Sequence, residues 1–374
     1  MKKILIGNNH SWNDQSIRIG DHHYAKLLVK QHWKVFWMSH PISPYHIFKS
    51  GNVERFKSWT KGVQKSQEVF FYTPFTFFPY YKKLFYKEWF GKNNLRFTIP
   101  SIKRILNKYH FLDVDILWIT DLSMYYLTHI VRYKKMVLRL IDDIPMYENS
   151  PASIKIIQDE LINKADYVVV TSKNLMKYQY LNNQNFYYVP NGVDVKHFQK
   201  KYKIPIEYQE IKSPRIIYLG GIYEWFDTEL LKYIASKLAN YNFILIGPSG
   251  IDLSDLKRYK NIFLLGIKKY NEIPAYLQYA DVGIIPFKNS QLTRSVSPIK
   301  MFEYFAAGLP VVSTRIEEAE SLNPPAYFTD EPAEFVKNLK ESFREGKNKK
   351  EYFEFVNNNS WDSRLSNILQ VLKS

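Results

Sequence analysis

The sequence predicts two tandem α/β domains, each built on a parallel β-sheet. Three observations predict this fold class. The chain has 374 residues, which is too long for one ordinary core and suits two large domains. Apolar strands alternate with amphipathic helices in both halves, at the spacing of βαβ units. A polar stretch from Pro190 to Pro214 separates the two series, because it starts with turn residues and lacks a clear period.

The first half begins with a strand, a helix and a strand. Strands are expected at residues 3–7, 35–39, 115–120, 136–141, 167–172 and 186–189, with helices at 21–32 and 152–164. In open parallel sheets the ligand crevice lies at the carboxyl ends of the strands. His10, Asp121, Asp142 and Ser172 follow such ends and are therefore candidates for a site.

The second half repeats the pattern. Strands are expected at residues 215–219, 243–247, 262–265, 281–286 and 310–314, with helices at 228–239, 272–278 and 361–372. Gly220 and Gly221 follow its first strand, where a close backbone approach to a ligand is possible, and Gly247 ends the second. A simple tight turn is the alternative for the glycine pair.

The stretch from Ser297 to Pro310 predicts a short helix that binds an anion. Ser297 is expected to cap the helix, with Pro298 in its first turn. Free N–H groups at such a helix start, with Lys300 one turn in, suit a phosphate. Glu303 shares the face of Lys300, so one ligand with phosphates and hydroxyls could use both. An amphipathic helix with a solvated charge pair is the alternative.

Composition restricts the classes of protein. The chain contains no cysteine, so a disulfide framework and thiolate metal sites are excluded. Residues 4–7 are too short an apolar run for a signal peptide, and no run of about 18 apolar residues occurs. The net charge of +16 suits nucleic acid, an anionic membrane surface or anionic substrates. A cytoplasmic protein, peripheral on the inner face of the plasma membrane, is expected.

An aromatic and basic segment at about residues 70–94 favours the membrane among these partners. Aromatic rings beside lysines suit the lipid headgroup zone, whereas a loop packed on its own domain is the alternative. The residues expected to meet the membrane are Phe77, Phe78, Tyr81, Lys82, Lys83, Phe85 and Trp89. Basic residues are otherwise dispersed and no recognition motif is present, so no nucleic-acid partner is expected.

The motifs resemble those of GT-B glycosyltransferases. The run Ser297-Pro298-x-Lys300-x-x-Glu303, continuing to Gly308-x-Pro310, is similar to their nucleotide-sugar motif. Residues 190–194, Pro-Asn-Gly-Val-Asp, resemble their domain junction, and the last helix opens with a tryptophan as theirs does. The resemblance implies two Rossmann-like doubly wound domains that face each other across a cleft, with the last helix crossing back.

The resemblance also implies a division of labour along the chain. Residues 1–194 would bind the acceptor, 195–213 would be a linker, 214–357 would bind the nucleotide sugar, and 358–374 would pack back on the first domain. Lys300 would hold the donor diphosphate and Glu303 the ribose hydroxyls. The remaining donor-binding candidates are Ser297, Gly221, Tyr223, Arg294 and Gly247, and the acceptor-binding candidates are His10, His22 and Arg18. No metal site and no cofactor are expected.

One departure from the family pattern concerns the mechanism. Retaining members carry a Glu-x7-Glu pair, whereas Ser295 stands eight residues before Glu303. The chain resembles the membrane-associated glucuronosyltransferases of xanthan and teichuronic acid synthesis, which lack that first carboxylate. This resemblance implies an aspartate base in the first domain, and Asp142 or Asp143 ends a strand where such a base belongs. Asp142 is favoured because it is closer to the strand end, and a turn-capping role is the alternative for both.

The expected function is therefore transfer of a sugar, with a uronic acid as one option, from a UDP-linked donor to a lipid-linked saccharide. Inversion by direct displacement is expected for this step in cell-surface polysaccharide synthesis. A retaining glycosyltransferase, a GT-B nucleotide-sugar epimerase and a basic nucleic-acid-binding protein are the alternatives. The sequence does not identify the donor sugar, the acceptor or the oligomeric state.

Overall fold

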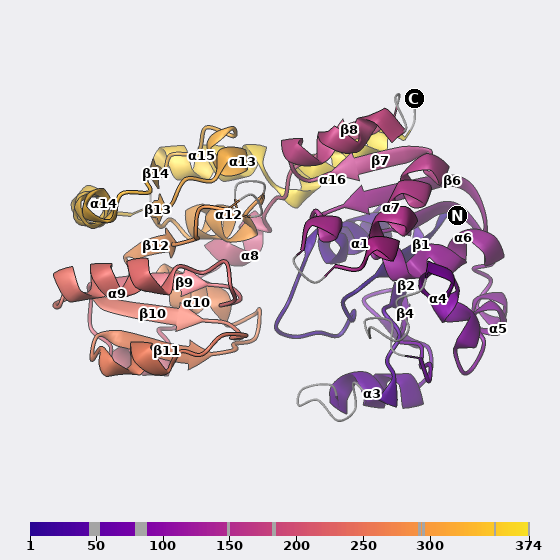
Figure 1. The fold of residues 1–374 in the computed structure, drawn as a ribbon, viewed down its shortest axis with the longest axis horizontal. Coiled ribbons are helices and arrows are strands. Elements are labelled where there is room, and N and C mark those ends of the chain that lie inside the picture. The colour runs from indigo at the N-terminus through magenta and orange to yellow at the C-terminus, as the bar shows by residue number, and fades with distance from the viewer. Residues whose placement is uncertain are drawn as a thin grey trace. The chain divides into compact units, whose positions relative to one another are not determined.

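The computed structural model describes residues 1–44, 53–78, 88–147, 150–181, 185–290, 293, 296–347 and 349–372. The chain divides into two compact units. The first contains Met1–Asp14, Asp21–Val189 and Asn367–Ser374, and the second contains Gln15–Gly20 and Pro190–Ser366. Each unit contains one largely parallel sheet with helices packed on it (Figure 1), so the predicted fold class is confirmed.

The sheet of the first unit runs in the order β3, β4, β2, β1, β5, β6, β7, β8. Its strands are β1 (Lys3–Asn8), β2 (Lys34–Ser39), β3 (Gln64–Ser66), β4 (Val69–Tyr72), β5 (Asp113–Ile119), β6 (Arg132–Leu140), β7 (Tyr167–Val170) and β8 (Phe186–Tyr188). Only the pair of β3 with β4 is antiparallel among these neighbours. Successive residues such as Ile4, Leu5 and Ile6 are all buried, because helices cover both faces of a parallel sheet.

The helices of the first unit follow the strands. They are α1 (Gly20–Lys30), α3 (Val53–Thr60), α4 (Glu88–Asn93), α5 (Ile102–Lys108), α6 (Leu127–Ile130) and α7 (Ala152–Lys164). Helix α7 has the bounds that the sequence predicts. Its residues Ile154, Ile157 and Leu161 are buried at the spacing of one helical face, which packs against the sheet.

The aromatic segment at 70–94 begins inside the fold. Phe71 and Tyr72 belong to β4, which pairs with β2, and both are buried. Phe75 is buried as well, whereas Phe77 is 60% exposed. Aromatic residues are good strand formers, so the first part of this run packs in its own domain, as the alternative interpretation held. Tyr81, Lys82, Lys83 and Phe85 lie outside the described residues.

The sheet of the second unit runs in the order β11, β10, β9, β12, β13, β14, and all its pairs are parallel. Its strands are β9 (Arg215–Leu219), β10 (Asn242–Ile246), β11 (Ile262–Gly266), β12 (Val282–Ile285), β13 (Val311–Ser313) and β14 (Tyr327–Phe328). Its helices are α8 (Val195–Gln199), α9 (Thr228–Lys237), α10 (Ile273–Gln278), α12 (Ile299–Ala306), α13 (Glu317–Glu320), α14 (Pro332–Glu345) and α15 (Lys350–Asn358). Strand β9 lies between β10 and β12, so the carboxyl ends of these two strands flank Gly220 and Gly221, which follow β9.

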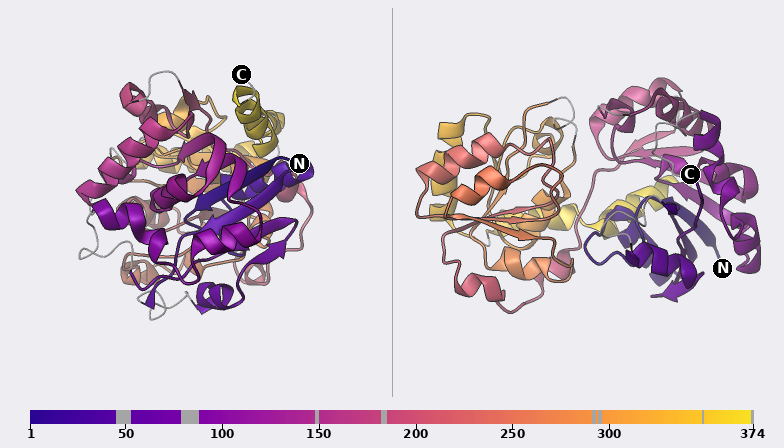
Figure 2. Two further views of the ribbon diagram at one scale, coloured as in Figure 1. Left: turned by 90° about the vertical axis from the view of Figure 1, so that its right-hand side faces the viewer. Right: turned by 60° about the horizontal axis from the view of Figure 1, so that its bottom comes forward.

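The last helix, α16 (Trp361–Val371), belongs to both units. Its first residues count with the second unit, and the residues from Asn367 onward count with the first. The end of α16 lies beside the strands of the first unit (Figure 2). There the Lys135 Nζ on β6 donates a hydrogen bond of 2.8 Å to the carbonyl of Leu372. Among the described residues, no helix is both long enough and apolar enough to cross a membrane.

Candidate functional site

The carboxyl edge of the second sheet is lined by glycines that no other residue could replace. Gly220 has a φ of 135°, and a Cβ there would lie 2.9 Å from the Lys300 Cε. Gly247 has a φ of 147°, and a Cβ there would lie 2.0 Å from the Gly220 carbonyl oxygen. Both backbones are therefore restricted to glycine, which lets the Lys300 side chain lie directly over the end of β9.

Helix α12 starts at this edge and carries the two charged groups that the sequence singles out. The Lys300 Nζ lies over the rings of Tyr218 and Phe287, 5.1 and 4.5 Å from their centroids. Glu303 is buried, and its carboxylate forms no hydrogen bond or ion pair with any other described residue. An aromatic face is a weak partner for an ammonium, so both groups keep hydrogen-bonding capacity for a ligand.

The electrostatics of this pair are strained. Burial lowers the pKa of Lys300 to about 8, although the charge of Glu303 opposes the shift. Burial likewise raises the pKa of Glu303 to about 7 against the charge of Lys300. Solvent still reaches part of Lys300, yet the mutual attraction does not offset the loss of hydration for either group. Strongly shifted pKa values of this kind cluster at functional sites, so Lys300 and Glu303 are candidates for ligand binding.

The junction motif holds the start of α12 in place. The Asn191 side chain donates a 3.0 Å hydrogen bond to the Ser297 carbonyl, and the Ser297 hydroxyl accepts from the Asn191 backbone N–H at 3.4 Å. A Cβ on Gly192 would lie 2.8 Å from the carbonyl of Asn359, just before α16. The Pro-Asn-Gly motif therefore joins the start of α12 to the start of the last helix.

The expected helix cap at Ser297 is wrong. The N-cap is Pro298, and no side chain caps the helix. The reason is the contact with Asn191, which engages the hydroxyl of Ser297. The first N–H groups of α12 consequently have no capping side chain, which favours an anion there.

Two of the other donor candidates can be placed. The Tyr223 ring fills the space beside Gly221 and Gly250, where a Cβ would come within 2.4 and 2.3 Å of it, and it packs on Trp225 at 4.9 Å. Gly221 thus accommodates an aromatic ring of its own chain. Arg294 lies outside the described residues, and so does Ser295.

The two adjacent aspartates of the first unit have different surroundings. Asp143 is buried, forms an ion pair with the Lys177 Nζ and accepts a 2.7 Å hydrogen bond from the Tyr178 hydroxyl. Its side chain does not cap the turn that follows. Asp142 is exposed at the end of β6. Asp142 is therefore the carboxylate that can still accept a proton from a ligand.

Desolvation by the surrounding protein raises the pKa of Asp142 even though solvent reaches its side chain, and the charge of Asp143 adds to the increase. A hydrogen bond from Tyr147 and the charge of Arg139 oppose it. A raised carboxylate pKa makes a better proton acceptor.

The acceptor candidates fall in different places. His10 is partly exposed, and its carbonyl accepts a 2.9 Å hydrogen bond from the Trp37 indole N–H. His22 is 1% exposed, with its ring 4.4 Å from that of Trp37 and 5.6 Å from that of Trp12. His22 therefore supports the loop from inside. Arg18 belongs to the segment Gln15–Gly20, which counts with the second unit.

A buried pair that the sequence did not single out lies at the same edge of the first sheet. The His40 Nδ1 lies 2.9 Å from both the Asp121 carboxylate and the Ser123 hydroxyl, and all three residues are buried. Desolvation acts to raise the pKa of Asp121, but His40 and the hydrogen bonds from Ser123 outweigh it and leave that pKa lowered. Only Asp121 carried a signal in the sequence, because it follows a strand end.

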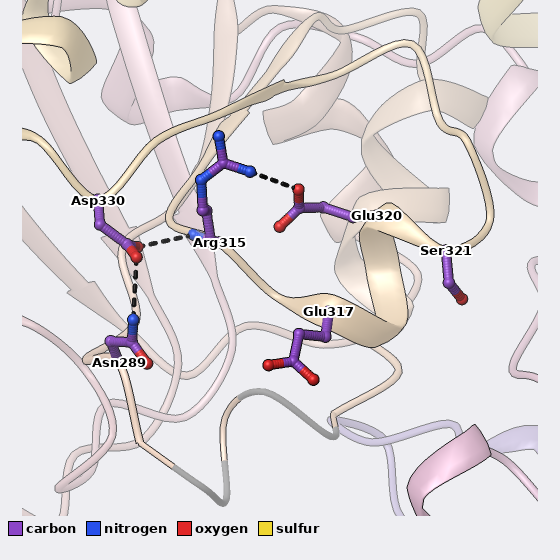
Figure 3. Close-up of a pocket in the computed structure, with 6 residues that line it drawn as sticks. All are labelled: Asn289, Arg315, Glu317, Glu320, Ser321 and Asp330. Atoms are coloured by element: carbon purple, nitrogen blue, oxygen red, sulfur yellow. Dashed lines mark hydrogen bonds and ion pairs between the residues drawn. The ribbon is translucent and has the colours of Figure 1, made fainter.

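A pocket of about 630 Å³ lies at the ends of β12, β13 and β14 (Figure 3). It is lined by Asn289, Arg315, Glu317, Glu320, Ser321 and Asp330. The Arg315 guanidinium lies 2.7 Å from the Glu320 carboxylate, and its backbone N–H donates to Asp330 at 2.9 Å. Among these described lining residues, three carboxylates accompany one cation, which already pairs with Glu320, so Lys300 is the better candidate for an anion site.

Metal ligation finds no support in the described part of the chain. No group of three or more His, Asp or Glu residues there is arranged to hold a metal ion.

Comparisons with known proteins agree with this geometry. Residues 213–344 match the family described as Glycosyl transferases group 1. A protein of Bacillus subtilis (strain 168), TuaH, assigned as a teichuronic acid biosynthesis glycosyltransferase, is 27% identical over 197 residues. That match covers 49% of this chain, and it spans about half the length of the relative, 50%.

Solved structures show the same fold. A UDP-forming α,α-trehalose-phosphate synthase from Burkholderia xenovorans, in complex with glucose-6-phosphate, has a TM-score of 0.69 at 13% identity, with all of both chains covered. Anabaena HepE in complex with UDP-glucose has a TM-score of 0.64 at 12% identity, also with full coverage of both chains. The chain therefore has the GT-B fold, as the motifs predict, and residues 213–344 of its second unit are similar to the group 1 glycosyl transferases.

The strain at α12 predicts that the double variant Lys300→Met, Glu303→Gln is more stable than the natural chain. The ionisation of Glu303 lowers the free energy of unfolding increasingly as the pH rises from 4.5 to about 7. The charge of Lys300 lowers it fully below about pH 8, and this loss disappears as the pH rises from about 8 to 10.5. The gain should be largest between pH 7 and 8, at about 2–5 kcal/mol. Chemical unfolding without ligand measures it, with Lys337→Met, at an exposed position, as the control that should change little. A less stable double variant would contradict the strain.

Proposed function

We propose that the chain transfers a sugar from a UDP-linked donor to a lipid-linked saccharide, with inversion at the anomeric carbon. The observation that carries the proposal is the partly buried Lys300 and the buried Glu303 on α12, whose charges lack hydrogen-bonding partners among the described residues. A nucleoside diphosphate supplies what each group lacks. Its phosphates match the ammonium, and its ribose hydroxyls donate to the carboxylate.

The relatives support UDP as the nucleotide and a cell-surface polymer as the product. HepE was solved with UDP-glucose, and the Burkholderia enzyme is UDP-forming. TuaH is assigned to teichuronic acid biosynthesis. We propose that Lys300 and the uncapped N–H groups of α12 bind the diphosphate, while Gly220 and Gly247 let the nucleotide approach the sheet. A uronic acid remains one option for the sugar.

In the proposed reaction, Asp142 is the general base. The acceptor hydroxyl oxygen bonds to the anomeric carbon while the bond from that carbon to the diphosphate oxygen breaks. The electron pair leaves with UDP, and the hydroxyl proton moves to Asp142. Asp143 is held by Lys177 and Tyr178 and serves to fix this turn. Ser295 in place of an acidic residue agrees with inversion, because no second carboxylate is placed there to assist retention.

The acceptor is proposed to meet the first unit, with His10 beside it at the exposed end of β1. The membrane surface is proposed to bind at the aromatic patch, defined here as Phe77, Phe78, Trp89 and Phe97. Phe77 and Trp89 are 60% and 52% exposed. The Phe97 ring packs 5.8 Å from Trp89 and 5.2 Å from Phe78, so these three rings form one cluster, and Phe77 is next to Phe78 in the chain. Apolar rings with basic neighbours suit an anionic bilayer.

Replacing Asp142 by asparagine should abolish turnover without affecting donor binding. Loss of a general base costs about 10²–10⁴-fold in rate, and Asp142 has no predicted contact with UDP. Acceptor-dependent release of UDP measures the rate, and calorimetry measures the affinity for UDP. Asp143→Asn is the matched control, which should lower stability and retain measurable turnover. Full activity of Asp142→Asn, or a product that keeps the anomeric configuration of the donor, would refute the mechanism.

Vesicle flotation tests the membrane proposal. The variant Phe77→Ser, Trp89→Ser should float with vesicles of anionic phospholipid several-fold less than the natural chain. The control Ile267→Ser removes an apolar side chain that is equally exposed, 60%, in the second unit, and it should float as the natural chain does. Equal flotation of all three proteins, or none by the natural chain, would reject the patch as the membrane site.

A further inference from the structure

A fully buried ion pair lies at the carboxyl edge of the first sheet. The Arg139 Nη1 on β6 is 3.1 Å from the Asp21 Oδ1 in the first turn of α1, and neither side chain is exposed to solvent. The Arg139 guanidinium also lies 5.4 Å from the centroid of the Tyr24 ring, one helical turn further along α1. The pair is remote from water on every side.

The Asp21 carboxylate joins three strands. Its Oδ2 accepts hydrogen bonds from the Asn8 side chain at 2.5 Å and from the Thr120 hydroxyl at 2.6 Å. Asn8 is the last residue of β1, and Thr120 directly follows β5. Through Arg139, the same carboxylate also holds β6. One side chain therefore fixes the ends of the three central strands β1, β5 and β6.

Stability alone does not explain this pair. Moving two charges out of water costs about as much as their attraction returns, and apolar replacements of such pairs are often neutral or stabilising. A pair that adds little to stability still fixes geometry and places a charge. The group beside it is Asp142, three residues after Arg139 and directly beyond the end of β6.

We propose that the Asp21–Arg139 pair is the positioning element of the catalytic base. Arg139 holds the strand end that precedes Asp142, and the negative charge of Asp21 partly cancels the effect of the Arg139 charge on the Asp142 carboxylate. This inference rests on the proposed role of Asp142. It adds two residues, neither of which touches a substrate, and assigns them opposite electrostatic effects on the same carboxylate.

The charges around Asp142 agree with this arrangement. The groups that act on its pKa are Arg139, which lowers it, Asp143, which raises it, and the hydroxyl of Tyr147, which lowers it by a hydrogen bond. Lys177 and Tyr178 pair with Asp143 from the 3₁₀ segment after β7. Among the described residues, Arg139 is the only cation that acts directly on the pKa of Asp142. Its removal should therefore change that pKa more than removal of any other cation.

The pH dependence of kcat/KM for acceptor-dependent UDP release tests the inference. The acid limb is the low-pH side of this profile, which reports the ionisation of Asp142. Arg139→Met removes the cation and should move the acid limb to higher pH, by on the order of half to one pH unit. Asp21→Asn keeps the shape of the side chain but leaves the cation unbalanced, so the limb should move to lower pH by a similar amount. The double variant should return the limb close to its natural position with a lower kcat.

Controls separate this role from a structural one. Thr120→Val removes one hydrogen bond to Asp21 without changing a charge, so it should leave the limb in place. If Arg139→Met and Asp21→Asn only lower kcat, or shift the limb in the same direction, the inference is wrong. If a single variant fails to fold, the double variant decides, because it buries no unpaired charge. An unchanged kcat in that variant would overturn the positioning role.

Failure of the underlying function would be recognised separately. A fully active Asp142→Asn enzyme refutes the base itself, whatever Arg139 does. If Asp142→Asn is inactive but Arg139→Met and Asp21→Asn both leave the acid limb at its natural pH, only the positioning role is refuted.

Discussion

Two charges on α12 that lack hydrogen-bonding partners within the described part of the chain are the main constraint on the second unit. Lys300 and Glu303 lie on one short helix, and burial shifts the pKa of each toward its neutral form. The backbone around these two side chains adopts unfavourable conformations. Gly220 and Gly247 adopt conformations that other residues avoid, and Asn191 fixes the start of the helix from the domain junction. These features lower the stability of the empty protein and suit the diphosphate site proposed above.

The first unit handles burial of charge in the opposite way. Asp21 and Arg139 are more deeply buried than Lys300, yet they form an ion pair with each other, and Asn8 and Thr120 donate hydrogen bonds to the carboxylate. The first unit therefore pairs its buried charges, whereas the described residues of the second unit leave Lys300 and Glu303 without hydrogen-bonding partners. The exposed Asp142 stands next to the paired Asp143, so the same contrast separates the proposed base from its neighbour.

The sequence predicted the fold class and most strands because apolar runs and glycines report burial directly. It placed Lys300 and Glu303 near the start of a short helix because a proline, a lysine and a carboxylate follow one another within two turns. It missed β4, since the strand Val69–Tyr72 opens an aromatic run that resembles a surface segment. It gave Ser297 a capping role because the contact with Asn191 joins residues 106 positions apart. The Asp21–Arg139 pair was beyond sequence reasoning for the same reason, as its partners are 118 positions apart.

Proton uptake on UDP binding tests the central claim most directly. Lys300 has a pKa of about 8 in the free protein, and a bound diphosphate should raise it. Calorimetry at pH 8 in two buffers of different ionisation enthalpy should therefore show uptake of roughly half a proton per UDP bound. Lys300→Met should lose this uptake together with most of the affinity. Tight UDP binding without any proton uptake, or with the same uptake in Lys300→Met, would contradict the account.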